Sequence, residues 1–125
     1  MKPPSRKTIG LIVILTFALQ GIASAHAFLD HAEPRVGSTT GKAPAEVRIW
    51  FTQRLEPAFS KIQVFDAQGK EIDKRDTHVD PKEKNLLLVS LRELPAGTYK
   101  VSWHVVSVDT HRTQGDFKFT VEPKG

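Results

Sequence analysis

The feature that most constrains this chain is a series of short apolar segments separated by turn-forming residues, with no long stretch of helical periodicity. Between residues 98 and 108, apolar side chains recur at every second position, as they do on one face of a β-strand: Tyr99, Val101, Trp103 and Val105. The predicted strands are 45–51, 62–65, a weaker and more charged 71–77, 86–91, 98–108 and 115–121.

The segments between these strands carry the residues that favour turns and loops. They are 66–69, which ends in glycine, the polar stretch 80–85, and 94–97, which contains proline and glycine. Many short strands with frequent turns are typical of two packed antiparallel sheets. The sequence therefore predicts an all-β fold, an immunoglobulin-like antiparallel sandwich or barrel of about seven strands.

The first 25 residues have the pattern of a secretory signal peptide. Positive residues at Lys2, Arg6 and Lys7 precede an apolar run of about 11 residues, and Ala23-Ser24-Ala25 resembles a cleavage site. An uncleaved anchor is the alternative, but a run of that length is too short for a membrane-spanning helix. We expect a cleaved leader at 1–25 and one exported domain at 26–125.

Cleavage of the leader would change the net charge of the chain. Three of the 18 Lys and Arg residues lie in the leader, together with none of the 14 Asp and Glu residues, so the mature chain carries about +1 charge with neutral histidines. Such a chain has no basic excess for nucleic acid. It also lacks cysteine, and the single methionine is Met1. Blue-copper, iron–sulfur and thioether sites are therefore excluded, and any metal needs nitrogen and oxygen ligands.

His26 would become the first residue of the processed chain. An N-terminal histidine offers a metal ion two donors, its α-amine and its imidazole Nδ1, which close a chelate ring. The α-amine has an ordinary pKa of about 7.7–8.0, so a metal displaces its proton readily near neutral pH. Coincidence is the alternative, because some residue must follow any cleavage site.

Asp109 and His111 form a second candidate pair, just after the apolar part of the strongest predicted strand. Residues two apart in extended backbone project to the same face, so both side chains could reach one ion. A polar turn with an incidental histidine is the alternative reading. With His26, the pair would supply three nitrogens and one oxygen in a tetragonal set, which suits one Cu(II) ion, with Ni(II) next.

The chain resembles the CopC family of periplasmic copper-binding proteins over nearly the whole of 26–125. The resemblance rests on 26–27, on 32–34 with Gly37, on 47–52, on 94–101 and, most specifically, on 103–111 and 115–119. It implies a seven-stranded immunoglobulin-like fold, a periplasmic location, a role in copper resistance or homeostasis, and a Cu(II) site at His26, Asp109 and His111. It also suggests a CopD-like inner-membrane copper transporter as partner, and we expect a monomer.

The chain departs from the family pattern at two points. Some relatives have a methionine-rich loop for Cu(I), which this chain lacks, and some have a carboxylate where it has Gln53. An amide there can hydrogen-bond a water but brings no charge.

The remaining histidines and the tryptophans are predicted to lie outside the ligand set. His104 has the opposite parity to Trp103 and should face away from it, His31 should face away from His26, and His78 lies in a charged loop. Trp50 and Trp103 are expected in or near the core.

Two functions of other classes remain open. One is a copper-dependent oxidative enzyme resembling lytic polysaccharide monooxygenases, in which Asp109 would occupy a position that oxygen chemistry needs open. The other is a metal-free immunoglobulin-like interaction module. The chain has no hydrolase triad, phosphate-binding glycine loop or CxxC motif, and we expect it not to be an enzyme.

Overall fold

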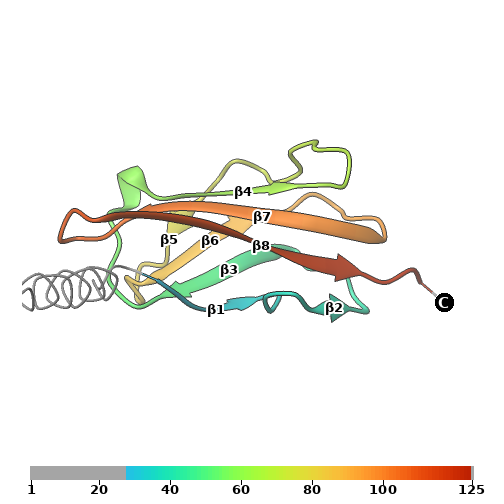
Figure 1. Cartoon of the computed structure of the whole chain (residues 1–125), viewed down its shortest axis with the longest axis horizontal. Helices are drawn as coiled ribbons and strands as arrows, with labels where there is room; N and C mark the ends of the chain where they lie inside the picture. Colours follow the sequence, from blue (N-terminus) through green and yellow to red (C-terminus); the bar gives the residue numbers. More distant parts are fainter. Residues whose placement is uncertain (1–27, 125) are drawn as a thin grey trace, which may run out of the picture.

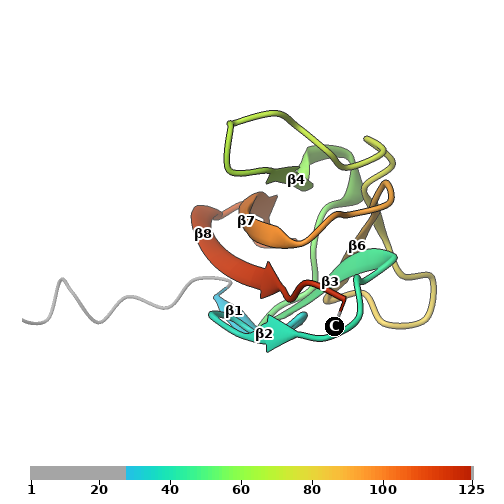
Figure 2. The same cartoon turned by 90° about the vertical axis from the view of Figure 1, so that its right-hand side faces the viewer.

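The computed structural model describes residues 28–124, which form two four-stranded sheets packed face to face (Figures 1 and 2). One sheet has the order β1(Leu29–Glu33), β3(Glu46–Phe51), β6(Leu86–Ser90), β5(His78–Val79). The other has the order β2(Thr39–Thr40), β8(Arg112–Val121), β7(Gly97–Val106), β4(Lys61–Phe65). Neighbouring strands are antiparallel, except for the short parallel pair β2–β8. The predicted β-sandwich is confirmed.

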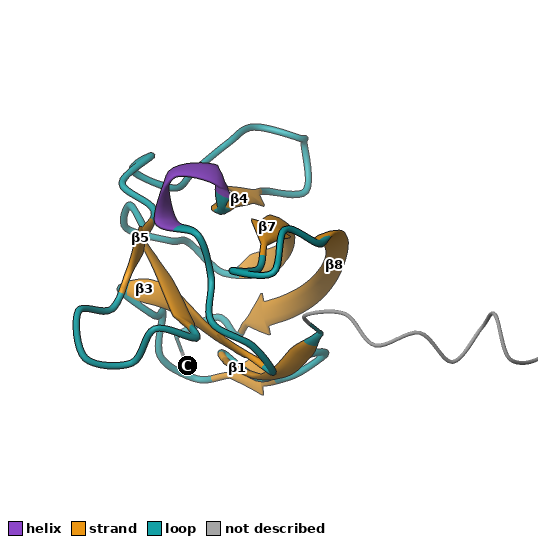
Figure 3. Cartoon of the chain, turned by 90° about the vertical axis from the view of Figure 1, so that its left-hand side faces the viewer, coloured by secondary structure: helices purple, strands orange, loops and turns teal. Residues whose placement is uncertain are grey.

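The helical content of the described chain is one short 3-10 turn, η1(Pro57–Phe59), drawn in purple in Figure 3. No helix within residues 28–124 has the length and apolar character that crossing a membrane requires. The turn lies between β3 and β4, at the end of the sandwich where β7 also ends, and the amide of Glu56 just before it donates a hydrogen bond to the Val106 carbonyl, at 2.8 Å.

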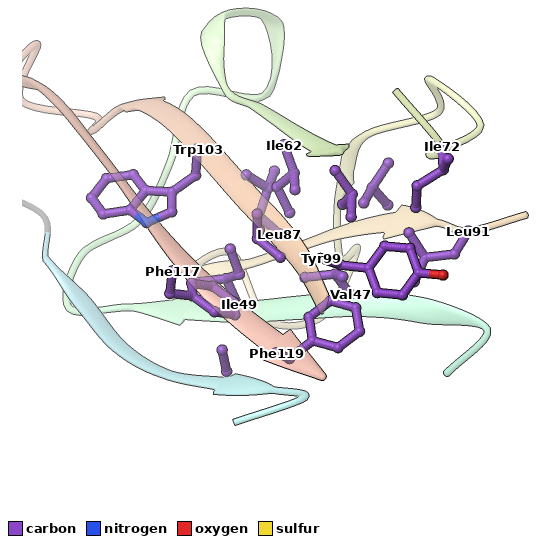
Figure 4. Packing of buried hydrophobic residues seen from close by; sticks show 14 of the residues in the cluster. Val47, Ile49, Ile62, Ile72, Leu87, Leu91, Tyr99, Trp103, Phe117 and Phe119 are labelled. Atoms are coloured by element: carbon purple, nitrogen blue, oxygen red, sulfur yellow. The ribbon is translucent and has the colours of Figure 1, made fainter. Parts of the chain in front are cut away.

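The inner faces of the two sheets form the core, as the alternating apolar residues predict (Figure 4). Trp103 is 7% exposed and meets the ring of Phe51 edge to face, with centroids 5.1 Å apart. The other large buried side chains come from the same alternating positions: Val47, Ile49, Tyr99, Val101, Val105, Phe117, Phe119 and Val121. Burial of these apolar faces is the main stabilising contribution that the structure shows.

The two tryptophans lie on different sides of the sandwich. Trp50 has the opposite parity to its core-facing neighbours and is half-buried on the outer face of β3. Its ring stacks on His31 of β1 with centroids 4.3 Å apart, and its Nε1 donates a hydrogen bond to Glu83 at 3.2 Å. The expectation of a core or near-core position therefore holds for Trp103, whereas Trp50 covers the outer surface of its sheet.

The prediction of a strand at 71–77 is wrong. The segment makes isolated bridges, Phe65 with Glu71 and Asp73 with Leu91, and the strand that follows is the two-residue β5. The buried carboxylate of Asp73 accepts hydrogen bonds from the amides of Val64, at 2.8 Å, and Arg75, at 3.1 Å. These side-chain bonds add to backbone bonds from the Ile72 amide to the Val64 carbonyl and from the Lys74 amide to the Ser90 carbonyl, so the segment bonds β4 on one side and β6 on the other.

Gly115 stands opposite Trp103 in the β7–β8 ladder, and the indole packs against its backbone. A Cβ at this position would lie 2.6 Å from Cζ2 and 2.9 Å from Cε2 of Trp103, closer than side chains tolerate. We expect Gly115→Ala to lower the free energy of unfolding by about 1–3 kcal/mol, the usual cost of overpacking a core. Urea denaturation measures this, with Gly41→Ala as control because nothing lies within 4 Å of its added Cβ. Equal stability of the two variants would contradict this packing.

Candidate metal site

The turn between β7 and β8 carries two of the three predicted ligands. The Thr110 amide donates to the Ser107 carbonyl at 2.8 Å, and the Ser107 amide donates to the His111 carbonyl at 3.0 Å. Thr110 has a φ of 71°, in the left-handed region, which lets the backbone reverse within these few residues. The turn therefore holds Asp109 and His111 close together, although the sequence argument assumed extended backbone.

The Asp109 and His111 side chains are in direct contact. Asp109 Oδ2 lies 3.2 Å from His111 Nδ1, and the two side chains are 48% and 52% exposed. The other carboxylate oxygen, Oδ1, accepts a hydrogen bond from the hydroxyl of Ser107. Hydrogen bonds, from the Ser107 hydroxyl first and from His111 next, hold the pKa of Asp109 below its ordinary value. The carboxylate is therefore ionised at neutral pH and is a suitable cation ligand.

His26 lies outside the residues that the structure describes, but the start of the described chain is fixed. Phe28 and Thr52 bond each other twice: the Phe28 amide donates to Thr52 Oγ1 at 3.0 Å, and the Thr52 amide donates to the Phe28 carbonyl at 2.9 Å. Two residues further on, the Arg54 carbonyl accepts the amide of Val108 at 3.0 Å.

The segment from Thr52 to Arg54 thus bonds Phe28, the first described residue, through Thr52, and the β7–β8 turn through Arg54. Leu55 continues this contact through an antiparallel bridge with Ser107. Figure 1 shows the start of β1 and the β7–β8 turn at the same end of the sandwich. Gln53 sits in the middle of this segment and is half-buried.

The other three histidines lie on other parts of the surface. His104 is exposed on the outer face of β7, opposite Lys61 and Gln114, which confirms that it faces away from Trp103. His31 is exposed, bonds Asp30 at 2.7 Å and stacks on Trp50. A register shift in β1 between Leu29 and His31 makes that strand irregular.

His78 lies in β5, exposed, with its Nδ1 3.0 Å from the Asp76 carbonyl. Between residues 28 and 124, no group of three or more His, Asp or Glu side chains is arranged to hold a metal ion. Within the described residues, Asp109 and His111 are thus a pair of potential ligands.

Sequence reasoning missed Ser107, which is fully buried and bonds Asp109. The available signal was its position two residues before Asp109, which the turn converts into a direct contact between the two side chains. The sequence prediction does not use this position, because it places residue 107 inside the strand 98–108 and not in the turn.

Comparison with known proteins places the chain in a family. The CopC domain model matches residues 29–122. Protein YobA of Escherichia coli K12 is 31% identical over 113 residues, which cover 90% of this chain and 91% of YobA. Copper resistance protein C of Escherichia coli is 32% identical over 124 residues, covering 92% and 93% of the two chains.

A solved structure agrees with the sequence relatives. CopC from Methylosinus trichosporium OB3b superposes with a TM-score of 0.75 at 31% identity, covering 80% of this chain and 97% of that one. Residues 29–122, which the CopC domain model matches, include both sheets and the Asp109–His111 turn. The chain belongs to the CopC family.

Proposed function

We propose that this protein is an exported copper-binding protein that serves copper homeostasis, resistance or delivery and holds one Cu(II) ion per chain. In this proposal the leader 1–25 is removed, and the ligands are the α-amine and Nδ1 of His26 together with Asp109 and His111. Membership of the CopC family and the copper-resistance relatives support a role with copper.

One observation carries the ligand assignment: the hydrogen-bonded path from Phe28 through Thr52 and Arg54 to Val108. Phe28 is two residues after His26, and two extended residues span at most about 7 Å. Because Thr52–Arg54 bonds both Phe28 and Val108, the described part of the chain begins beside the turn that carries Asp109 and His111. This path supports the proposal that His26 binds the same ion as Asp109 and His111.

The donor types determine which metal is preferred. Three nitrogens and one carboxylate oxygen suit a tetragonal Cu(II) ion, and copper binds such sites more tightly than the other common divalent ions. One carboxylate leaves a site charge near +1, and Asp109 is ionised without needing a metal to displace its proton. We assign the site to binding and transfer of copper, with no chemical reaction of its own.

The proposed location is the periplasm, and the proposed partner is a CopD-like copper transporter of the inner membrane. Both follow from the leader pattern and from the resemblance stated for the sequence. We propose that the protein acts as a monomer, in which all four donors come from one chain.

Metal selectivity tests this function. We expect protein that begins at His26, dialysed against mixed metals, to retain one equivalent of Cu(II) in preference to Ni(II) and Zn(II). EPR should show a tetragonal, nitrogen-rich signal. Addition of a reductant in air should produce no more peroxide than the same concentration of free Cu(II) does. Failure to retain Cu(II), or retention of Zn(II) in equal amount, would contradict the proposal.

A further inference from the structure

We propose that Ser107 is a positioning residue that sets the orientation of the Asp109 carboxylate for metal binding, an inference that rests on the proposed function of the site. Ser107 is fully buried, and its hydroxyl donates to Asp109 Oδ1. The other oxygen of the same carboxylate meets His111 Nδ1 at 3.2 Å. One buried hydroxyl therefore fixes the side chain that in turn contacts the second proposed ligand.

The backbone and the side chain of Ser107 have separable roles. Its amide and carbonyl close the turn, through His111 and Thr110 respectively, and its bridge with Leu55 ties the turn to the segment after β3. All of these bonds use the backbone and survive replacement of the side chain by alanine. The hydroxyl is the part that reaches Asp109, whose side chain is half-exposed, and it also lies 3.4 Å from the His111 carbonyl.

A carboxylate free to rotate must lose that freedom when metal binds, whereas a carboxylate already held by a buried donor does not. Residues that hydrogen-bond metal ligands commonly change metal affinity by 10–100-fold for this reason. We therefore expect Ser107→Ala to weaken Cu(II) binding about 10–100-fold while the protein still folds. At saturating Cu(II), its EPR signal should shift toward that of Asp109→Ala.

Ser60 provides a matched control. It is also buried, and its hydroxyl bonds two backbone groups near the same end of the sandwich: it donates to the Glu56 carbonyl at 2.9 Å and accepts the Val106 amide at 3.3 Å. Ser60→Ala removes a buried hydroxyl without touching the carboxylate. We expect it to change thermal stability but to leave Cu(II) affinity within about twofold of wild type, far below the effect of losing a ligand contact.

A double-mutant cycle separates positioning from a structural role. If Ser107 acts through Asp109, Ser107→Ala should cause no further loss of affinity in an Asp109→Ala background. An equal loss in both backgrounds would overturn the inference, as would a Ser107→Ala protein that binds Cu(II) like wild type.

A measurement on the unmodified apo protein does not depend on any variant folding. Side-chain NMR couplings should report one χ1 rotamer for Asp109, and rotamer averaging would contradict the inference. A wild-type protein that takes up no copper would overturn the proposed function and this inference together, whereas copper binding without coupling between Ser107 and Asp109 would overturn this inference alone.

Discussion

Replacement of His111 by alanine is expected to weaken Cu(II) binding by more than about 100-fold. Loss of a hydrogen bond to a ligand already costs 10–100-fold, and loss of a ligand costs more. His111 would supply one of the three nitrogen donors, and its removal also takes away the contact at 3.2 Å that its Nδ1 makes with Asp109 Oδ2. Competition with a Cu(II) chelator of known affinity measures the change.

His78→Ala is the control for this experiment. His78 is exposed in β5, on the other sheet, where it contacts the Asp76 carbonyl. Its replacement should leave Cu(II) affinity unchanged. If the two variants lose affinity equally, histidines of the surface bind copper non-specifically, and the site does not lie at the β7–β8 turn.

Replacement of Trp103 by alanine is expected to lower the free energy of unfolding by about 3–5 kcal/mol, the range for large aromatic residues removed from a core. A domain of this size has about 5–15 kcal/mol in total, so the melting temperature should fall by about 15–30 °C. Trp103 contacts Phe51 of the opposite sheet and covers Gly115, so its removal opens a cavity between the layers. Thermal denaturation of the apo protein measures the effect.

Trp50→Ala is the matched control, because it removes the same side chain from the outer face. It loses the stack on His31 and the hydrogen bond to Glu83, contacts that are partly open to solvent. We expect a loss of about 1 kcal/mol, typical of a hydrogen bond with modest burial. Equal losses for the two tryptophans would mean that the core does not lie where the structure places it.

The sandwich could be predicted because its strands bury one face each. In β3 the residues Val47, Ile49 and Phe51 are at most 1% exposed, while the residues between them are half-buried, so a two-residue period appears directly in the sequence. In β8, the polar residues from Arg112 to Gln114 also pair with β7. These pairs form through the backbone, and hydropathy alone placed the start of that strand three residues too late.

The structure of segment 71–77 could not be predicted from its pattern of polar and apolar residues. Its structure depends on Asp73, whose carboxylate is 1% exposed and bonds the Val64 and Arg75 amides. A buried aspartate looks like any surface aspartate in a sequence. Its role is visible only when the backbone groups that it bonds are known.

Part of the candidate site could likewise be predicted from the sequence, and part could not. Asp109 and His111 could be chosen because their residue types and spacing suit a metal. The hydroxyl of Ser107, and the path by which Thr52 and Arg54 bring Phe28 beside Val108, depend on contacts between distant parts of the chain. Spacing along the sequence does not report such contacts.

The most direct test of the proposed copper site is a Cu(II) titration of protein beginning at His26 beside the same protein with one added glycine before His26. The addition keeps every side chain but moves the α-amine away from the histidine, which breaks the chelate. We predict one tightly bound equivalent for the native form and binding weaker by more than about 100-fold for the extended form, since a ligand is lost. Equal binding by both forms, or binding by neither, would contradict the assignment of the His26 α-amine as a copper ligand.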